Sequence, residues 1–241
     1  MSSPAKTCIF AFGGIGRYVQ FGKRYGFSQA VRYFLNTTWF DWRTGLDTAH
    51  SVAKADLELG RAGRGDEVEY LPSWTVTVKR AFRVVGKFLG TGALAQTFVD
   101  VGAGKGKVCV VWARELRRAG LSEARVLGVD ISEKLCHIAD ENIAHAGLSA
   151  RVAIRQHDAA DLRLDDIDRV ILWLYNPFGE STVLKLLKNL QGRVAAILYC
   201  NPVAHSVIVA AGYEVKYEER SWHPNLSFTL YIPRPGPGSA A

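Results

Sequence analysis

Residues 98–107 read Phe-Val-Asp-Val-Gly-Ala-Gly-Lys-Gly-Lys, so a short apolar run leads directly into three alternating glycines. The run is typical of a buried strand. A glycine loop between a strand and a helix lets a ligand approach the backbone at the helix N-terminus, where free N–H groups are available. Gly102, Gly104 and Gly106 are therefore predicted to hold a bulky, partly anionic ligand, although a tight strand-to-helix turn would need similar glycines.

Downstream of this loop, short apolar runs alternate with amphipathic stretches, which is the pattern of a parallel sheet covered by helices. Two further extended runs near the end predict an antiparallel hairpin. The predicted strands are 98–101, 125–129, 152–156, 170–174, 195–200, 213–219 and 226–232, and the predicted helices are 107–119, 133–146, 180–189 and 204–211.

The fold class predicted by this order is α/β, with a doubly wound, mostly parallel seven-stranded sheet and a helical N-terminal extension. We expect residues 1–95 to form a cap that faces the substrate, residues 96–235 to form the ligand-binding domain, and residues 236–241 to fray. In the extension, helices are predicted at 28–40, 46–60 and 76–89, with an exposed loop at 61–66. The glycines of residues 12–17 are interpreted as a flexible turn, because no acid-ended strand follows them at the spacing of a nucleotide site.

The composition is that of a folded globular protein, with 48% hydrophobic and 22% charged residues among 241. The net charge of +7 is uneven, because residues 1–95 hold 13 Lys and Arg against 7 Asp and Glu, whereas the remainder holds 17 against 16. A basic face attracts acidic protein, nucleic acid or anionic small molecules, although a solvated surface is the commoner reason for one.

The four cysteines, Cys8, Cys109, Cys136 and Cys200, are far apart in the sequence and suggest neither a disulfide framework nor a metal site. The N-terminus lacks a basic region followed by a long apolar segment, and no apolar run approaches the roughly 20 residues of a membrane span. These features favour a reducing, cytoplasmic location without a membrane span.

Two acidic residues follow the next two predicted strands and favour an adenosine ligand. Asp130 ends the second strand, where a carboxylate accepts hydrogen bonds from both ribose hydroxyls. Asp158 follows the third strand in the sequence Gln-His-Asp-Ala, where it would accept from the adenine amino group, unless it is a solvated loop residue. A dinucleotide oxidoreductase also uses such an acid, but its G-x-G-x-x-G spacing fails here because residue 107 is lysine.

Residues 97–232 resemble the class I S-adenosyl-L-methionine (SAM)-dependent methyltransferases, whose Rossmann-like sheet carries an inserted antiparallel last strand. Within this family the chain is similar to a bacterial group with a D-x-G-x-G-K-G-[RK] loop, matched by Asp100–Lys107. The group also has an F-D-x-R-x-G-x-D-T element, matched by residues 40–48, and a Y-x-P-S element, matched by residues 70–73. The resemblance implies SAM as the cofactor and an in-line methyl transfer.

A more distant similarity links residues 70–73 to the Y-x-x-[TS] loop of non-SET lysine methyltransferases, which folds over the cofactor. Tyr70 and Ser73 would do so here, unless Ser73 is simply the N-cap of a helix. Amino-methyltransferases hold the acceptor nitrogen with an Asn or Asp followed by proline and an aromatic residue, which implies that role for Asn176. One proline instead of the usual two separates Asn176 from Phe178, and a plain turn is the alternative.

The predicted function is therefore SAM-dependent N-methylation of a protein lysine or another amine. The alternatives are a small-molecule O-methyltransferase, which would place a His or Lys near the methyl group, and a non-catalytic SAM-binding module that binds nucleic acid or protein. The methyl acceptor, protein or small molecule, is not identified by the sequence, and nucleic acid is less favoured as a partner because no RNA-binding motif is present. The oligomeric state is left open.

Methyl transfer does not need an essential general base, but an ammonium acceptor must first lose a proton, for which His157, Tyr175 or water could assist. Aromatic residues of the extension, Trp39, Phe40, Trp42 and Trp74, are candidates to line the acceptor site, although packing on the sheet would also explain them. The candidate catalytic residues are Tyr175, Asn176, Pro177 and Phe178, and the candidate cofactor-binding residues are Tyr70, Ser73, Asp100, Gly102, Ala103, Gly104, Gly106, Asp130, Ile131, His157, Asp158, Ala159 and Asn176, with no metal ligands.

Overall fold

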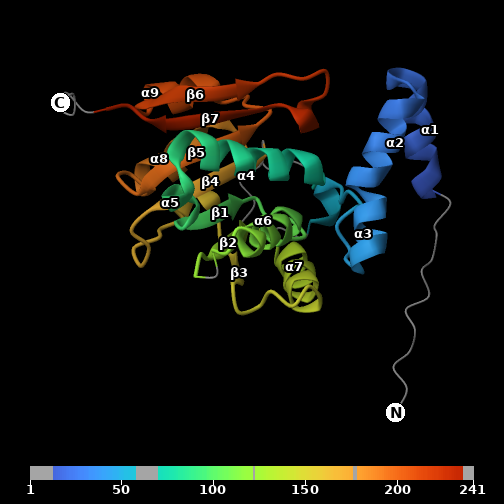
Figure 1. Cartoon of the computed structure of the whole chain (residues 1–241), viewed down its shortest axis with the longest axis horizontal. Helices are drawn as coiled ribbons and strands as arrows, with labels where there is room; N and C mark the ends of the chain where they lie inside the picture. The colour runs from blue at the N-terminus through green and yellow to red at the C-terminus, as the bar shows by residue number, and fades with distance from the viewer. Residues whose placement is uncertain (1–12, 58–69, 122, 176–177, 236–241) are drawn as a thin grey trace, which may run out of the picture.

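The computed structural model of the chain describes residues 13–57, 70–121, 123–175 and 178–235, and Figure 1 shows their arrangement. The core is one seven-stranded sheet in the order β3-β2-β1-β4-β5-β7-β6. The first five strands in this order are parallel, and β7 pairs antiparallel with both β5 and β6. The strands are β1 (Thr97–Val101), β2 (Val126–Asp130), β3 (Val152–Gln156), β4 (Val170–Tyr175), β5 (Val194–Cys200), β6 (Tyr213–Glu219) and β7 (Phe228–Pro233).

This topology confirms the predicted fold class, including the terminal hairpin with its last strand inserted antiparallel. The five parallel strands begin and end within one residue of the predicted positions. Continuous apolar runs mark such strands clearly, because both faces of a parallel sheet are covered. The hairpin was less well predicted at its second strand, since residues Pro224–Leu226 form a 3₁₀ turn before β7 starts.

Helices cover both faces of the sheet. Because successive strand residues point to opposite sides, neighbouring residues of one strand pack beneath different helices. Phe98 belongs to the apolar cluster beneath α4, α6 and α7, whereas the next residue, Val99, belongs to the cluster beneath α8 and α9. The helices are α4 (Thr75–Leu89), α5 (Thr91–Leu94), α6 (Lys107–Arg118), α7 (Glu133–His145), α8 (Glu180–Asn189) and α9 (His205–Ala210).

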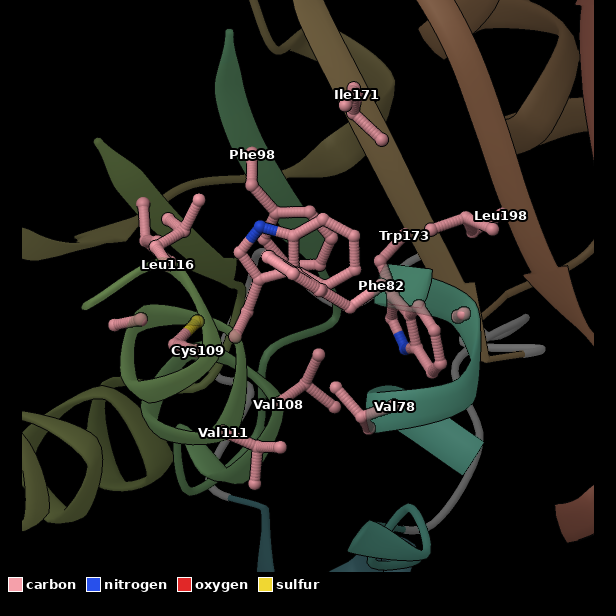
Figure 2. Close-up of a cluster of buried hydrophobic side chains, with 14 of the residues drawn as sticks. Val78, Phe82, Phe98, Val108, Cys109, Val111, Leu116, Ile171, Trp173 and Leu198 are labelled. Atoms are coloured by element: carbon pink, nitrogen blue, oxygen red, sulfur yellow. The ribbon is translucent and has the colours of Figure 1, made fainter. Parts of the chain in front are cut away.

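The core that anchors the glycine loop is aromatic. Phe98 on β1 stacks on Trp112 of α6, with ring centroids 3.9 Å apart and 14° between the planes. Phe82 of α4 meets the same indole edge-on at 5.1 Å, and Figure 2 shows Phe82 and Phe98 among the buried side chains of this cluster. All three residues are buried. Such ring contacts contribute about 0.5–1.5 kcal/mol per pair beyond area burial, so β1 and α6 are held firmly on either side of the loop.

The described residues at the start of the N-terminal extension form the helices α1 (Gly13–Tyr25), α2 (Phe27–Asn36) and α3 (Thr38–Thr44), ahead of α4 and α5. Figure 1 shows them at one end of the molecule, next to the start of α4. The amide N–H of Val76 donates to the Asn36 side chain at 2.9 Å, which joins α2 to the first turn of α4.

Three predictions for the extension were wrong. The single helix at 28–40 is interrupted at Thr37, where the backbone leaves helical geometry. The helix at 46–60 is absent from its described part, which holds a bridge between Val52 and Tyr70 and only one turn of 3₁₀ helix at Lys54–Asp56. The predicted turn at 12–17 is instead the start of α1 from Gly13 onward.

Other predictions fall partly or wholly on residues outside the described ranges, namely the loop at 61–66, Cys8 and the tail 236–241. Cys109, Cys136 and Cys200 are buried free thiols. Among the described residues, no helix has both the length and the apolar character that crossing a bilayer requires.

Candidate active site

The glycine loop connects β1 to α6 at the carboxyl edge of the parallel strands. Its three glycines have positive φ angles, 83° at Gly102, 54° at Gly104 and 77° at Gly106. Residues with a side chain rarely adopt positive φ angles, so a loop of this shape requires glycine at these positions. The amide N–H groups of Gly102 and Ala103 donate to the carbonyl of Val129 at 2.8 and 2.9 Å, which ties the loop to β2.

Asp130 ends β2 beside this loop. Its Oδ2 accepts the amide N–H of Gly104 at 2.7 Å, and its Oδ1 accepts the amide N–H of Ser132 at 2.9 Å. Burial raises the pKa of the carboxyl, while these backbone donors act in the opposite direction. Each carboxylate oxygen can accept more than one hydrogen bond, so Asp130 retains capacity for a further donor. The structure therefore fixes the predicted ribose-binding carboxylate against the predicted glycine loop.

Tyr70 lies directly on the glycine loop. A Cβ atom built on Gly104 would be 2.2 Å from Cε2 of the Tyr70 ring, which is closer than real Cβ contacts come. The phenol oxygen donates to the carbonyl of Thr48 at 2.9 Å, and the ring centroid is 5.9 Å from the amine of Lys105. Tyr70 thus covers Gly104 of the loop. Ser73 is buried nearby, but the N-cap of α4 is Trp74, so the alternative of Ser73 as an N-cap was wrong.

The backbone under Tyr70 is shaped by Asp41. The buried carboxylate of Asp41 accepts from the amide of Thr48 at 2.6 Å, from the Thr48 hydroxyl and from the amide of Ala49. These bonds hold the Thr48 carbonyl in place for the Tyr70 hydroxyl. A role for Asp41 was not predicted, although it belongs to the F-D-x-R-x-G-x-D-T element. An acidic residue among aromatic residues was the signal in the sequence.

Asn142 of α7 joins the same element to the glycine loop. Its amide group donates to the carbonyls of Asp47 and Lys105 at 3.0 and 2.9 Å and accepts the amide N–H of Asp47 at 2.9 Å. The Lys105 amine is 2.9 Å from the Asp47 carboxylate. Asn142 therefore connects α7, the extension and the loop, a role that no pattern in the sequence predicts.

Asp100 on β1 is buried below the loop. Its carboxylate has the Cys109 thiol as a hydrogen-bond partner, with 3.7 Å between Sγ and Oδ2. Burial raises the pKa of Asp100 to about 8, an effect that the thiol reduces and the negative charge of Asp130 increases. A buried acid with one weak donor is costly unless a cation or a proton accompanies it.

The third predicted acid, Asp158, lies at the end of β3. The amide of the preceding residue, His157, donates to the carbonyl of Asp130 at 2.9 Å, so the two strand ends are adjacent. Asp158 Oδ1 accepts from the amide of Ala160 at 2.8 Å and caps a 3₁₀ turn at Ala159–Asp161. The sequence Gln-His-Asp-Ala therefore lies next to Ile131, whose carbonyl accepts from the Gln156 side chain at 3.4 Å.

On the acceptor side, Tyr175 ends β4 and its hydroxyl donates to the side chain of Asn225. Burial raises the pKa of Tyr175 above its ordinary value. Phe178 is 8% exposed and packs in the apolar cluster that faces α8. Asn176 and Pro177 lie outside the described residues.

An aromatic cluster surrounds Trp74 close to Tyr175. Tyr33 of α2 stacks on the buried indole at 5.8 Å with 14° between the planes, and His223 stacks on it at 5.1 Å with 16°. Asn225, which accepts from Tyr175, also accepts a hydrogen bond at its backbone carbonyl from Thr77 at 2.5 Å. Tyr33, His223 and Asn225 were not predicted, because they come from segments far apart in the sequence.

The other aromatic candidates are not in this cluster. Trp39 and Trp42 have exposed side chains, 37% and 62% respectively, and contact each other at 4.7 Å. Phe40 lies beneath the amine of Lys107, 4.9 Å from its ring centroid. Lys107 is buried at the N-terminus of α6, its amine donates to the carbonyl of Asn36, and burial lowers its pKa to about 7.

Comparison with known proteins agrees with this geometry. Residues 98–195 match the family described as a methyltransferase domain. No curated protein sequence is similar to the chain.

Solved structures with a similar arrangement include magnesium protoporphyrin IX methyltransferase (ChlM) from Synechocystis PCC 6803 with bound SAM. It is 18% identical with a TM-score of 0.50, over 85% of this chain and 96% of that chain. TrmK from M. capricolum, in complex with S-adenosyl-homocysteine, is 18% identical with a TM-score of 0.47, over 65% of this chain and 66% of that one. The ribosomal protein L11 methylase from Lactobacillus delbrueckii subsp. bulgaricus is 19% identical with a TM-score of 0.42, over 58% and 70%. Identities this low establish the fold alone.

Proposed function

We propose that the chain is a class I SAM-dependent methyltransferase that methylates a nitrogen of a protein lysine or another amine, in agreement with the match of residues 98–195 to a methyltransferase domain. In this proposal residues 96–235 bind the donor, and residues 1–95 form the side that faces the acceptor. The observation that carries it is the placement of Tyr70 on Gly104, because this puts a segment of the extension over the predicted cofactor loop.

The residues at the carboxyl edge fit SAM in shape and charge. The three positive-φ glycines give the loop its shape, with the Tyr70 ring packed on Gly104, and Asp130 has acceptor capacity for ribose hydroxyls. His157, Asp158, Ala159 and Ile131 lie at the adjoining strand ends and would surround the adenine. Asp158, which caps its own turn through Oδ1, is the residue assigned to the adenine amino group.

Asp100 supplies an electrostatic reason for a cationic ligand. Its carboxylate is buried with a thiol donor, and its pKa of about 8 reflects the cost of holding a negative charge there. SAM has an ammonium and a sulfonium, and a positive charge nearby would lower this pKa and offset that cost. The loop and β1 therefore favour a cation over a neutral ligand.

When bound, SAM supplies a methyl group already activated by its sulfonium, so the chain mainly has to align the acceptor and exclude water. A nitrogen lone pair forms the new N–C bond as the S–C bond breaks, and the amine must have lost a proton beforehand. Tyr175 and Asn176 follow β4, and we assign them, with Pro177 and Phe178, to holding the acceptor nitrogen. The hydrogen bond from Tyr175 to Asn225 fixes the strand end from which this segment starts.

His223 is not suited to be the histidine base that the main rival, O-methylation, would use. His223 is the imidazole packed on Trp74, and its Nδ1 accepts from the amide of Asn225 at 3.1 Å. Burial lowers the pKa of this ring, so the neutral form predominates at pH 7. A neutral ring that accepts at Nδ1 has its proton on Nε2 and has no free nitrogen to take a proton from a hydroxyl.

The acceptor class is tested by incubating the protein with methyl-labelled SAM and fractions of a bacterial lysate. We expect label in protein that is stable to mild base, as N-methyl groups are and methyl esters are not. Asn176→Ala should lower the incorporation, whereas Gln191→Ala, at an exposed position beyond α8, should not. Label found in RNA or in small molecules would show that the acceptor belongs to that class and not to protein. SAM binding without any methyl transfer would favour the non-catalytic SAM-binding module.

A further inference from the structure

Helix α2 exposes an apolar stripe to solvent. Phe27, Val31, Phe34 and Leu35 are 84%, 38%, 36% and 47% exposed. Their spacing of four, three and one residues places them on one side of the helix. The opposite side packs inward, since Ala30 and Thr37 are buried and Tyr33 stacks on Trp74. Phe34 also packs edge-on against Tyr18 of α1, with ring centroids 5.6 Å apart, so Phe27, Val31 and Leu35 are the part of the stripe that is most open to solvent.

The stripe continues onto α3 through aromatic contacts. The ring of Phe34 is 6.5 Å from that of Trp39, and Trp39 is 4.7 Å from Trp42. Trp42 is 62% exposed. We call Phe27, Val31, Phe34, Leu35, Trp39 and Trp42 the α2–α3 apolar face. Figure 1 shows both helices at the end of the molecule, beyond the sheet.

The charges around this face have one sign. Residues 13–44 contain a single acid, Asp41, which is buried against Thr48 and Ala49. Their bases are Arg17, which bonds inward to the Ala49 carbonyl, and four with exposed side chains, Lys23, Arg24, Arg32 and Arg43. The surface thus combines aliphatic and tryptophan side chains with exposed cations and no exposed carboxylate among these helices.

We propose that the α2–α3 apolar face docks on the surface of an anionic lipid bilayer. Amphipathic helices with Trp, Phe and Leu on one face and Lys and Arg beside it lie in the interface between headgroups and acyl chains. Each cation near an anionic surface adds attraction that depends on ionic strength. The membrane would thereby bring the acceptor side of the enzyme close to lipid-associated acceptors.

Two other occupants fit this surface less well. Single-stranded nucleic acid stacks on aromatic rings, but Val31 and Leu35 offer bases neither stacking nor hydrogen bonds. In a symmetric dimer formed through this face, each copy would bring its four exposed cations towards those of the other, with no exposed acid on α1–α3 to pair with them.

The test is sedimentation of the full chain with vesicles of phosphatidylcholine alone and of phosphatidylcholine mixed with phosphatidylglycerol. The chain should sediment with the anionic vesicles and be released by high salt. Phe27→Ser with Trp42→Ser should reduce the partition coefficient by about tenfold or more, because each side chain would bury its apolar area in the interface. Arg24→Glu with Arg32→Glu should also reduce it and weaken its dependence on salt.

The matched control is Leu184→Ser with Lys188→Glu, because both residues are exposed on α8, and it should leave vesicle binding unchanged. Thermal unfolding would show that all variants remain folded. The proposal is overturned if the folded chain does not sediment with anionic vesicles at low salt, or if the control variant loses binding equally. It is also overturned if the serine variants abolish self-association or binding to single-stranded RNA while vesicle binding is unaffected.

Discussion

The ring of Tyr70 occupies the space that a side chain at residue 104 would need, since a Cβ on Gly104 would be 2.2 Å from the ring. This contact joins the N-terminal extension to the loop that follows β1. Tyr70 is held in turn by the Thr48 carbonyl, and Thr48 by Asp41. The glycine at position 104 therefore serves two purposes, because its φ of 54° shapes the loop and its missing side chain admits the ring.

Gly104→Ala should impair both stability and cofactor binding. The alanine would be strained at positive φ and would displace Tyr70, and we expect a loss of about 1–3 kcal/mol in the free energy of unfolding. Urea denaturation and calorimetric titration with SAM measure the two effects. Gly92→Ala is the control, because no atom lies within 4 Å of the added methyl group. Equal behaviour of the two variants would rule out the close packing of Tyr70.

Asp41→Ala should weaken SAM binding without touching the cofactor loop itself. It would leave the amides of Thr48 and Ala49 and the Thr48 hydroxyl without their acceptor, at a cost of about 2–4 kcal/mol in folding stability. Tyr70 would lose its anchor as a consequence. Asp41→Asn keeps one acceptor oxygen and should recover part of the SAM affinity, and the exposed Asp56→Ala should have little effect. If Asp41→Ala lowers the stability but leaves the SAM affinity unchanged, Asp41 has no influence on the SAM site.

The titration of Asp100 should make the stability of the protein depend on pH. The folded protein keeps a proton on this carboxyl up to about pH 8, whereas the unfolded chain releases it near the ordinary value for aspartate. The free energy of unfolding therefore falls as the pH rises from the ordinary value for aspartate towards 8. Relative to Asp100→Asn, the wild type should lose stability between pH 5 and pH 8, by at most about 1.4 kcal/mol per pH unit.

Urea denaturation of both proteins at four pH values checks this difference. Lys107, whose pKa is about 7, titrates in the same range, but its contribution is common to both proteins and cancels in the comparison. A difference that is flat with pH, or that moves in favour of the wild type as pH rises, would mean that Asp100 is not held in a raised-pKa environment.

The sheet could be predicted from the sequence because each parallel strand is an apolar run followed by a distinctive end. Phe98 and Val99 face opposite covered sides, so both are apolar, and Asp130 marks where the second strand stops. The part of the site built from strand ends follows from that regularity. Gly104 and Asp130, 26 residues apart, meet through a 2.7 Å hydrogen bond because their strands are neighbours.

The extension could not be predicted in the same way, because side chains from elsewhere determine its backbone. Residues 46–49 do not start a helix, since Asp41 takes the amides of Thr48 and Ala49 and Asn142 takes that of Asp47. At the break between α2 and α3, the buried Thr37 hydroxyl donates back to the Tyr33 carbonyl and contacts the Tyr18 hydroxyl. Such bonds depend on the folded arrangement and leave no periodic pattern in the sequence.

The central claim, that the glycine loop and Asp130 form a SAM site, is tested most directly by calorimetric titration of SAM into the wild type, Asp130→Ala and the exposed control Asp140→Ala. The wild type and the control should bind one SAM per chain with equal affinity. Asp130→Ala should bind at least about tenfold more weakly, because ribose hydroxyls and the Gly104 amide would lose a charged acceptor. Absence of SAM binding by the wild type, or unchanged affinity in Asp130→Ala, would contradict the claim.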